Sequence, residues 1–293
     1  MTYTYNNLKI ALYSLAGKYP FPEQSSIGKS VMGRELYCVR LGRGERKIIC
    51  VGAHHALEWL TSVMLVCFAD LYASSYTAGA PLYGHDIAAL FERCSIYIIP
   101  MLNPDGVELV AGNIPKNHPK YIDIVNMCGS LDFATIWQAN INGVDLNHNY
   151  NAMWAEGALC SDAVLSPSPT RFGGMFPESE PESHALADFT RKIAPDMVIA
   201  YHSQGREIFY DFNGKMPGDT VRIAERMAKS SGYTLCKPEG FAGFGGYKDW
   251  FIDTFNRPGF TVEIGKGTNP IGIEQLAEVL GENLPLILDA AGM

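Results

Sequence analysis

Short apolar runs that alternate with helical patterns constrain the fold of this chain most. Five such runs are apolar enough to be buried strands. We predict strands at Leu36–Leu41, Lys47–Val51, Ser95–Met101, Asp196–Tyr201 and Phe260–Ile264. The turn-forming residues 42–45 join the first two. Apolar strands separated by helices are typical of an α/β domain with a largely parallel sheet.

Helical patterns occupy the intervals between these strands. The first covers residues 1–20 and ends near Gly17. The others are predicted at Glu58–Tyr76, Ser179–Ile193, Asp219–Ser231 and Ile273–Ala291. We expect Pro285 to interrupt the last helix, because proline lacks the N–H that a helix interior needs. The sequence shows no repeat, low-complexity tract or linker, so residues 1–293 are expected to form one domain.

The stretch from about Val107 to Pro177 has few regular signals and is rich in Asn, Gly and Pro. Long structured loops in compact domains usually serve a function. In an open α/β sheet, ligands bind beyond the carboxyl ends of the strands. We therefore look for chemistry in the residues that directly follow predicted strands.

Composition and charge exclude several classes of partner. Hydrophobic residues make up 47% of the chain and charged residues 18%, which favours a packed globule over a disordered chain. The formal net charge is −8. Binding to nucleic acid or to an anionic membrane surface needs a basic surface. We therefore expect neither nucleic acid nor a membrane as a partner.

The N-terminal residues and the cysteines suggest a compartment. Residues 1–21 lack the basic start, continuous apolar core and small-residue cleavage site of a signal peptide, so no secretion signal is expected. No membrane span is expected either, since we find no run of about 18 apolar residues. The seven cysteines form no CxxC pair, and several lie in strand-like runs. Buried, reduced thiols in a cytoplasmic protein are the simplest interpretation.

The first candidate for chemistry directly follows the predicted strand Lys47–Val51. His55 and Glu58 are three residues apart at the entry to a helix, a spacing that lets both side chains ligate one ion. Such a pair occurs by chance about 0.4 times in a chain of this composition, so it is weak evidence alone. On this motif alone, a glutamate stabilised by the helix dipole beside an ordinary histidine is the slightly better explanation. His54 is the rival ligand, and we rank His55 first.

Two further candidates occupy similar positions. His202 follows the predicted strand Asp196–Tyr201, and taken alone it is better explained as a hydrogen-bonded structural histidine. Glu263 lies within the apolar strand Phe260–Ile264. Burying an unpaired carboxylate is costly, so we expect a cation or a metal-bound water beside it. A salt bridge or an exposed edge position is the alternative.

Together these residues match one task. Two histidines and one glutamate form the catalytic type of zinc site, with a fourth position left for water. A metal lowers the pKa of its water towards about 7 and polarises a carbonyl group. A separate carboxylate then serves as general base and acid. We predict His55, Glu58 and His202 as zinc ligands and Glu263 as the base. Such sites also accept other divalent ions.

Several short motifs accompany these residues along the chain. They are HxxE at residues 55–58, NPDG at 103–106, GVDLN at 143–147, SEPE at 179–182, HS at 202–203 and TVE at 261–263. In these motifs the sequence resembles the zinc metallocarboxypeptidase family, the type of carboxypeptidase A, from about Ser26 to Leu288. The resemblance implies one α/β domain with a mixed central sheet flanked by helices and one zinc ion. It assigns the metal to His55, Glu58 and His202 and the role of general base and acid to Glu263. It also implies that Asn147 helps to hold the substrate carboxylate.

The chain departs from the family pattern at the substrate-binding positions. Typical members have an arginine directly after the motif asparagine, but here His148 follows Asn147. A neutral imidazole cannot form the bidentate pair that arginine makes with a carboxylate. The family's oxyanion-stabilising arginine is expected just after a tryptophan, where this chain has Gln138. Tyr247 is the nearest candidate for the family's substrate-capping tyrosine.

Five segments carry the variant pattern: WQAN at 137–140, GVDLNHN at 143–149, SEPE at 179–182, KDWF at 248–251 and RPGFT at 257–261. In these segments the chain resembles the γ-D-glutamyl-L-diamino acid peptidase branch of the family. This resemblance implies a murein-type peptide as substrate, cut between γ-D-glutamate and diaminopimelate or lysine. Such substrates carry free carboxylates, and Arg171 in the irregular region is a candidate to bind one; a plain surface role is as probable.

Two other hypotheses stay open from the sequence. The first keeps the zinc but changes the substrate, to that of a carboxypeptidase or an N-acyl amino-acid deacylase of the same superfamily. The second is a non-catalytic binding module on a peptidase fold, which the lost arginines and tyrosine allow. The complete predicted ligand set and Glu263 argue against it.

Overall fold

A mixed sheet of eight strands runs through the computed structural model, which describes residues 2–238 and 240–293. The strand order is β1-β2-β4-β3-β5-β8-β6-β7. The strands are β1 Glu23–Lys29, β2 Glu35–Leu41, β3 Arg46–Val51, β4 Cys94–Ile99, β5 Met197–Ser203, β6 Glu207–Phe209, β7 Thr234–Cys236 and β8 Gly259–Ile264. All five strands predicted from apolar runs are present, within two residues of the predicted ends.

The four central strands β4, β3, β5 and β8 are mutually parallel, as the sequence pattern indicates. The flanking pairs make the sheet mixed, because β1 with β2, β2 with β4, and β6 with β8 are antiparallel. The turn at residues 42–45 joins β2 to β3, but β4 lies between these two strands in the sheet. The parallel centre therefore aligns the carboxyl ends of β3, β5 and β8 along one edge.

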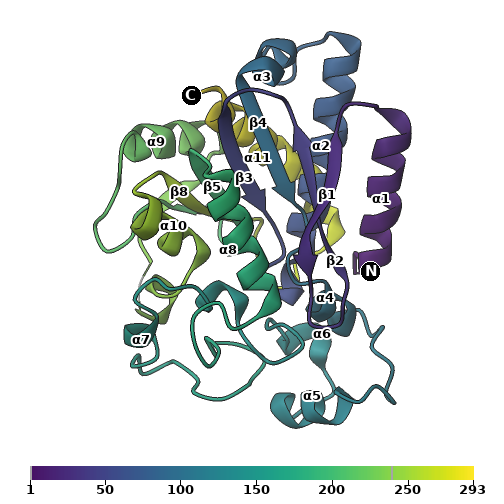
Figure 1. Ribbon diagram of the computed structural model, residues 1–293, viewed down its shortest axis with the longest axis vertical. Coiled ribbons are helices and arrows are strands. Elements are labelled where there is room, and N and C mark those ends of the chain that lie inside the picture. Colours follow the sequence, from purple (N-terminus) through teal and green to yellow (C-terminus); the bar gives the residue numbers. More distant parts are fainter. Residues whose placement is uncertain (1, 239) are drawn as a thin grey trace.

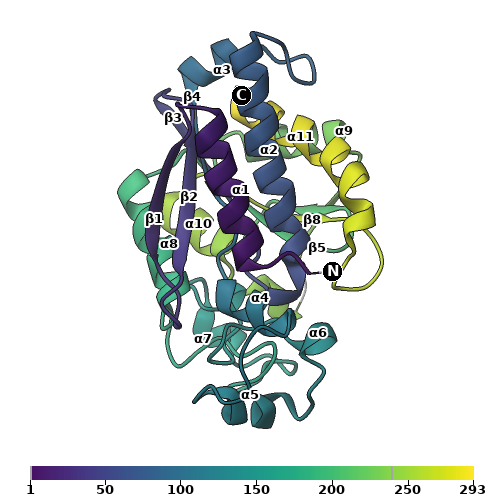
Figure 2. The same cartoon turned by 90° about the vertical axis from the view of Figure 1, so that its right-hand side faces the viewer.

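Helices cover both faces of the sheet. They are α1 Tyr5–Lys18, α2 Trp59–Ala78, α3 Ile87–Arg93, α4 Pro104–Val110, α5 Tyr121–Cys128, α6 Phe133–Ile136, α7 Trp154–Gly157, α8 Pro181–Ile193, α9 Thr220–Ser231, α10 Tyr247–Phe255 and α11 Leu276–Gly292. The described residues also form four short 3₁₀ turns, η1 Ala56–Glu58, η2 Leu146–His148, η3 Gly240–Gly243 and η4 Ile273–Gln275. Helices α1, α2, α9 and α11 pack on one face, and α8 and α10 on the other (Figures 1 and 2).

Helix α2 is the most buried of the helices in this layer. The segment Ala56–Ala78 is long and apolar enough to cross a membrane by composition alone. In the fold, however, 83% of its apolar window is buried. Residues on all sides of α2 contact the sheet, α1 or α11, which explains why its sequence lacks a polar face.

Pro285 does not interrupt the last helix, contrary to expectation. Helix α11 continues through it to Gly292. The neighbouring side chains Leu284, Leu286 and Ile287 are almost fully buried in the main core. Burial of these apolar side chains offsets the one backbone hydrogen bond that proline removes from the helix.

The irregular stretch between β4 and β5 has a small core of its own. Helices α4, α5 and α6 gather near the carboxyl ends of the central strands, at the lower end of Figure 1. Their apolar side chains pack against Ala56 and Leu57 of η1, with Trp137 fully buried at the centre. The backbone N–H of Ala56 also donates to the Gln138 carbonyl (2.9 Å). This long loop region therefore supports η1, the turn that carries Glu58.

Candidate active site

The turn after β3 presents two of the predicted metal ligands. Glu58 is the last residue of η1, and His55 is the residue just before it. The turn begins at Ala53, which adopts a left-handed conformation with φ of 48°. The Ala53 N–H donates to the Thr61 hydroxyl oxygen (2.8 Å), and this hydroxyl donates to the Glu58 carbonyl (2.7 Å). The first turn of α2 thus fixes the position of both predicted ligands.

The other two candidates come from neighbouring parallel strands. His202 lies near the end of β5 and Glu263 near the end of β8. The register pairs them directly, so that their side chains leave the sheet side by side. Since β5 is also the neighbour of β3, all four residues reach the same edge of the sheet.

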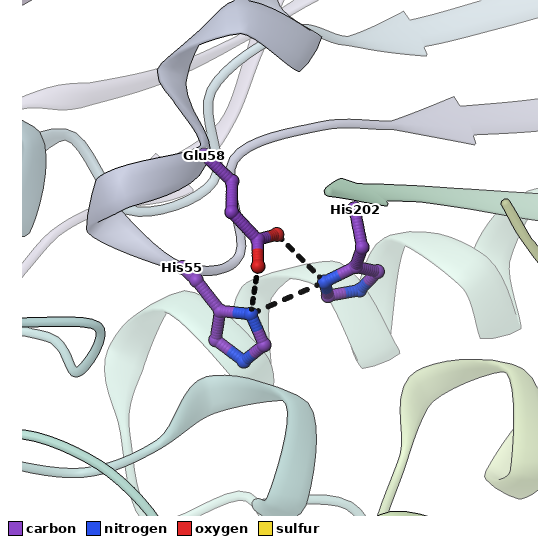
Figure 3. Close-up of side chains that lie close together, drawn as sticks. All are labelled: His55, Glu58 and His202. Atoms are coloured by element: carbon purple, nitrogen blue, oxygen red, sulfur yellow. Dashed lines mark hydrogen bonds and ion pairs between the residues drawn. The ribbon is translucent and has the colours of Figure 1, made fainter. Parts of the chain in front are cut away.

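His55, Glu58 and His202 converge on one point, as Figure 3 shows. One oxygen of Glu58 is 2.9 Å from His55 Nδ1, and its other oxygen is 2.9 Å from His202 Nδ1. The two Nδ1 atoms are 3.2 Å apart. His202 and Glu58 are almost fully buried, and His55 is partly buried. Three potential ligand atoms are therefore held within a single small space.

This donor set fits a zinc ion. Two ligands of a tetrahedral zinc ion, each at about 2.0–2.1 Å, lie roughly 3.3 Å from each other. The separation of the two histidine nitrogens agrees with that value. Two imidazoles and one carboxylate also leave a coordination position open, as catalytic zinc sites do.

Asp145 orients His55, a role that the sequence reasoning did not assign. One carboxylate oxygen of this buried aspartate lies 3.0 Å from His55 Nε2, and the other accepts the Arg171 N–H (3.0 Å). A carboxylate on the far nitrogen fixes the imidazole tautomer and leaves Nδ1 free for a metal. The signal was present in the sequence, because Asp145 belongs to the GVDLN motif.

His54, the rival ligand, lies outside the cluster. Its ring stacks on His202 with centroids 5.2 Å apart, and it is fully buried. Burial lowers the pKa of His54, and the charges of His202 and His55 lower it further. A neutral imidazole packed behind a ligand histidine supports the position of that ligand. The choice of His55 over His54 as the residue facing Glu58 agrees with the structure.

Asn269 closes the side of the cluster near β5. Its side-chain N–H₂ donates to the Ser203 carbonyl (2.6 Å) and lies 3.5 Å from a Glu58 oxygen. Its side-chain oxygen accepts a hydrogen bond from the Ser203 hydroxyl (2.7 Å). The sequence gives no signal for this contact, since Asn269 lies in an irregular segment between β8 and η4.

A cavity of about 560 Å³ opens beside the cluster. It is lined by His55, Asn147, His148, His202, Phe209, Pro238, Ala242, Lys248, Asp249, Thr261 and Glu263. Burial raises the pKa of Glu263 well above its ordinary value, and the nearby charge of Glu58 raises it further, whereas His55 lowers it. A partly buried carboxylate thus faces the same space as the metal-ligand group.

Two of the predicted substrate contacts line this cavity. Asn147 and His148 both lie in η2 and are partly buried. The His148 Nδ1 atom is 2.7 Å from the Phe244 carbonyl and donates to it. Its ring stacks on Phe241 with centroids 4.0 Å apart. Burial lowers the pKa of His148, which keeps the imidazole neutral.

Arg171 and Gln138 lie outside the cavity. Arg171 lines a second cavity of about 620 Å³ that shares His148 with the first. Its guanidinium is half exposed and lies 4.0 Å from an Asp162 oxygen. The Gln138 side chain accepts a hydrogen bond from the Thr170 hydroxyl (2.9 Å), one residue along the chain from Arg171.

The prediction that Tyr247 contacts substrate is wrong. Tyr247 is fully buried, and its hydroxyl shares a 2.7 Å hydrogen bond with Thr190 of α8. Its ring packs between Tyr150 and Trp250 in the core under the cavity. The first residue of α10 points into the helix–sheet interface, so the phenol has no access to the metal-ligand group.

The fold and the convergent His, Glu and His side chains define a class of metal-dependent hydrolase, and sequence comparison identifies the family. Residues 9–283 match the model of the zinc carboxypeptidase family, Peptidase_M14. The chain belongs to this family and is a zinc metallopeptidase.

Two bacterial relatives are similar over most of the chain. Gamma-D-glutamyl-L-diamino acid endopeptidase 1 of Lysinibacillus sphaericus is 33% identical over 98% of this chain and 71% of its own length. The uncharacterized protein YqgT of Bacillus subtilis is 31% identical over 89% of this chain and 69% of its own length. Bovine carboxypeptidase B is more distant, at 25% identity over 82% of this chain and 57% of its own length.

Solved structures show the same fold. Thrombin activatable fibrinolysis inhibitor aligns with a TM-score of 0.79 at 20% identity and covers all of this chain, which spans 74% of that structure. Murein-tripeptide amidase MpaA from Escherichia coli O157 aligns with a TM-score of 0.59 at 22% identity, over 94% of this chain and 95% of its own. The predicted fold, a mixed central sheet flanked by helices in one domain, is confirmed.

Proposed function

We propose that the protein hydrolyses the bond between γ-D-glutamate and a diamino acid in peptides derived from peptidoglycan. The observation that carries the proposal is the shared cavity, in which the metal-ligand group and Glu263 face one space. The relative that is 33% identical over nearly the whole chain bears the name of this activity. The departures from a general carboxypeptidase, His148 and Gln138, also support a narrower substrate.

In this proposal His55, Glu58 and His202 hold the zinc ion. The ion, when bound, polarises the scissile carbonyl and makes water acidic enough to react near neutral pH. Asp145 keeps the His55 ring oriented, and the neutral His54 packs behind His202. These contacts hold the donor atoms in place before substrate arrives, so that little reorganisation is needed during the reaction.

Glu263 acts as general base and then as general acid. Its carboxylate lies beside His202 through the register of β5 and β8, close to the position where water and the scissile carbonyl would meet. It accepts the proton of the attacking water and delivers it to the leaving amine of the diamino acid. Burial, which raises its pKa, makes it a stronger base than an exposed carboxylate.

Asn147 and His148 contact the substrate in the same cavity. Asn147 offers an amide that can donate to a substrate carboxylate or carbonyl. Neutral His148 supplies a wall that stacks on Phe241 and separates the two cavities. Arg171 lines the second cavity, where it can contact a more distant part of the peptide, whereas Gln138 lines neither cavity.

We also propose a reducing compartment, the cytoplasm. The support is the state of the cysteines: all seven thiols are free, and Cys38, Cys50 and Cys94 are buried. Burial raises the pKa of the Cys38 thiol to about 12, which keeps it protonated and unreactive. Free thiols in this number are typical of proteins that stay in a reducing environment.

A digest of defined peptides by the zinc-loaded protein tests the activity. The panel contains L-Ala-γ-D-Glu-diaminopimelate, its lysine counterpart, peptides ending in C-terminal Phe or Lys, and N-acyl-aspartate. Mass spectrometry of the products is expected to show cleavage at the γ-D-glutamyl linkage. Release of only C-terminal Phe or Lys would establish a carboxypeptidase instead, and cleavage of only the acyl-aspartate a deacylase. No turnover with zinc bound would favour a binding module.

A further inference from the structure

A buried ion pair lies in the wall of the active-site cavity, and the proposed chemistry does not use it. Lys248 and Asp249 are neighbours at the start of α10, and both line the cavity with His55, His202 and Glu263. Their exposed fractions are only 3% and 2%. The sequence KDWF to which they belong stands out as a motif without an assigned role.

Both side chains keep hydrogen-bonding capacity in reserve. The Lys248 ammonium donates to the Asp211 carbonyl (2.5 Å) and forms an ion pair with Asp249 Oδ1. An ammonium group has donors to spare beyond these contacts. Asp249 Oδ1 is buried, and the Lys248 ammonium is the one partner that the described residues give it, so the carboxylate can still accept a hydrogen bond from a further donor. Burying such an incompletely bonded pair is costly for a fold.

The surrounding backbone holds the pair in place. Gly246 is the N-cap of α10, and a Cβ at this residue would lie 2.5 Å from Asp249 Oδ2. The Tyr247 N–H donates to the side-chain oxygen of Asn147 (3.2 Å), which ties the start of α10 to the opposite wall of the cavity. The buried Tyr247 and Trp250 rings anchor the helix below. The pair is therefore a fixed feature of the cavity rather than two mobile surface charges.

Among the residues that line the cavity, this pair is best suited to bind a charged group of the substrate. Of the lining residues that the structure describes, Lys248 is the one lysine or arginine. His148, which stands where relatives of the carboxypeptidase type carry arginine, is kept neutral by burial. A carboxylate that enters the cavity away from the metal-ligand group therefore meets one cationic side chain, Lys248, with the Asp249 carboxylate directly beside it.

We propose that Lys248 and Asp249 bind the zwitterionic end of a diamino dicarboxylic acid side chain, with its carboxylate on Lys248 and its ammonium on Asp249. This inference rests on the proposed function and names the preferred leaving half of the peptide. Diaminopimelate ends in a carbon that bears both an ammonium and a carboxylate, whereas lysine ends in an ammonium alone. The protein accordingly discriminates in favour of diaminopimelate peptides.

The test compares three peptides that share the γ-D-glutamyl half. They end in diaminopimelate, in diaminopimelate amidated at its distal carboxylate, and in lysine. For the zinc-loaded protein, kcat/KM is expected to fall roughly 10- to 100-fold from the first peptide to the other two, the cost of one charged hydrogen bond. In Lys248→Met, the ratio of kcat/KM values for the first two peptides is expected to fall towards one.

Matched variants separate recognition from folding. Lys215→Met removes an exposed lysine that pairs with Asp253 outside the cavity, and it should leave the ratio unchanged. Lys248→Met leaves Asp249 buried and unpaired, so its thermal midpoint is measured beside that of Lys248→Met/Asp249→Asn, in which no lone charge remains. If Lys248→Met does not fold, the ratio of kcat/KM values for the first two peptides is measured in the double variant instead. Lys248→Arg, which keeps the positive charge, should keep part of the discrimination.

Two failures are distinguishable. Cleavage of all three peptides with equal kcat/KM, or an unchanged ratio in the folded Lys248 variants, would overturn the role of the pair while the proposed function stands. No cleavage of any γ-D-glutamyl peptide, with zinc bound and C-terminal Phe or Lys released, would overturn the proposed function and this inference together.

Discussion

At the scale of single residues, Glu263 is the sharpest test of the proposed chemistry. Glu263→Gln keeps the size of the side chain but removes its basicity, so we expect kcat to fall roughly 10²- to 10⁴-fold. Zinc content should be unchanged, because the ligand atoms of His55, Glu58 and His202 are untouched. Steady-state kinetics beside metal analysis measures both quantities.

The matched control for that variant is Glu225→Gln. Glu225 is an exposed residue of α9 that lies outside the lining of the cavity. Its activity should stay close to that of the unaltered protein. Full activity in Glu263→Gln would remove this residue from the mechanism.

A substitution at Asp145 tests whether its contact with the His55 ring contributes to metal affinity. Asp145→Asn keeps the shape of the side chain but weakens its bond to His55 Nε2. Loss of such a partner typically lowers metal affinity about 10- to 100-fold. Competition for zinc with a fluorescent chelator measures the change, and Asp162→Asn, which alters only an exposed aspartate near Arg171, is the control. Equal zinc affinity in both variants would contradict the role of Asp145.

Glu182 gives a prediction about pH. This fully buried glutamate accepts hydrogen bonds from the Val31 N–H (3.0 Å) and the Asn140 amide (3.1 Å). Burial raises its pKa from 4.5 to about 7. The folded state thus holds a proton that the unfolded state releases, and stability falls as pH rises from about 4.5 to 7. The shift corresponds to a loss on the order of 3 kcal/mol.

Urea unfolding at pH 5 and pH 8 measures this effect. We expect Glu182→Gln to reduce the difference in unfolding free energy between the two pH values, because glutamine does not titrate. The control is Glu92→Gln, an exposed glutamate paired with Arg43. An identical pH dependence in the Glu182 variant and the unaltered protein would exclude Glu182 as its source.

At the scale of elements, the turn between β2 and β3 shows how closely the backbone packs. A Cβ on Gly44 would lie 1.8 Å from the Arg93 carbonyl carbon, which is backbone and cannot rotate away. We expect Gly44→Ala to destabilise the protein by about 1–3 kcal/mol or more. Gly17→Ala in α1 is the matched substitution, since no atom lies within 4 Å of a Cβ at Gly17. Because alanine favours a helix more than glycine does, this variant should stabilise the protein by about 0.5–1 kcal/mol. Urea unfolding compares the two.

Buried elements could be predicted from sequence because a continuous apolar run is stable only when it is packed in a core. The central strands and α2 are of this kind. The edge strand β1 was not predicted, since its sequence EQSSIGK is polar and mostly exposed. Its place comes from pairing with β2, which no local pattern encodes. The continuation of α11 through Pro285 depends likewise on packing that the local sequence does not contain.

The residues of the candidate site likewise differ in how well the sequence predicts them. His55, Glu58, His202 and Glu263 could be found because each follows or ends an apolar strand. Asp145 and Asn269 reach the cluster from irregular segments, so only the folded chain shows their contacts. Tyr247 was misassigned because its chain position near the motif says nothing about the direction of its side chain, which is set by the packing of α10.

At the scale of the whole molecule, the metal should stabilise the fold without being required for it. The two main cores pack on the sheet away from the cluster, so the secondary structure should survive metal removal. Zinc at about 1,000 times its dissociation constant contributes about 4 kcal/mol, which for a chain of this size raises the melting temperature by roughly 5–10 °C.

Calorimetry before and after chelation measures that shift, with circular dichroism as the check on secondary structure. We expect one zinc ion to restore the original midpoint. Restoration should fail in Glu58→Gln, because that variant lacks a ligand. An unchanged midpoint after complete removal of zinc would show that the cluster does not bind metal in the folded state.

The pairing of β5 with β8 has a consequence for how the protein is made. A chain emerging from the ribosome contains all three candidate ligands once residue 202 has been made. Strand β8, Gly259–Ile264, is not made until 57 to 62 residues later. Until then the place beside His202 lacks its carboxylate. On our proposal for Glu263, a nascent chain can gather the residues that bind zinc yet cannot cut peptides. Proteolytic competence therefore arrives late in synthesis, when β8, the last strand of the described sheet in chain order, has been made.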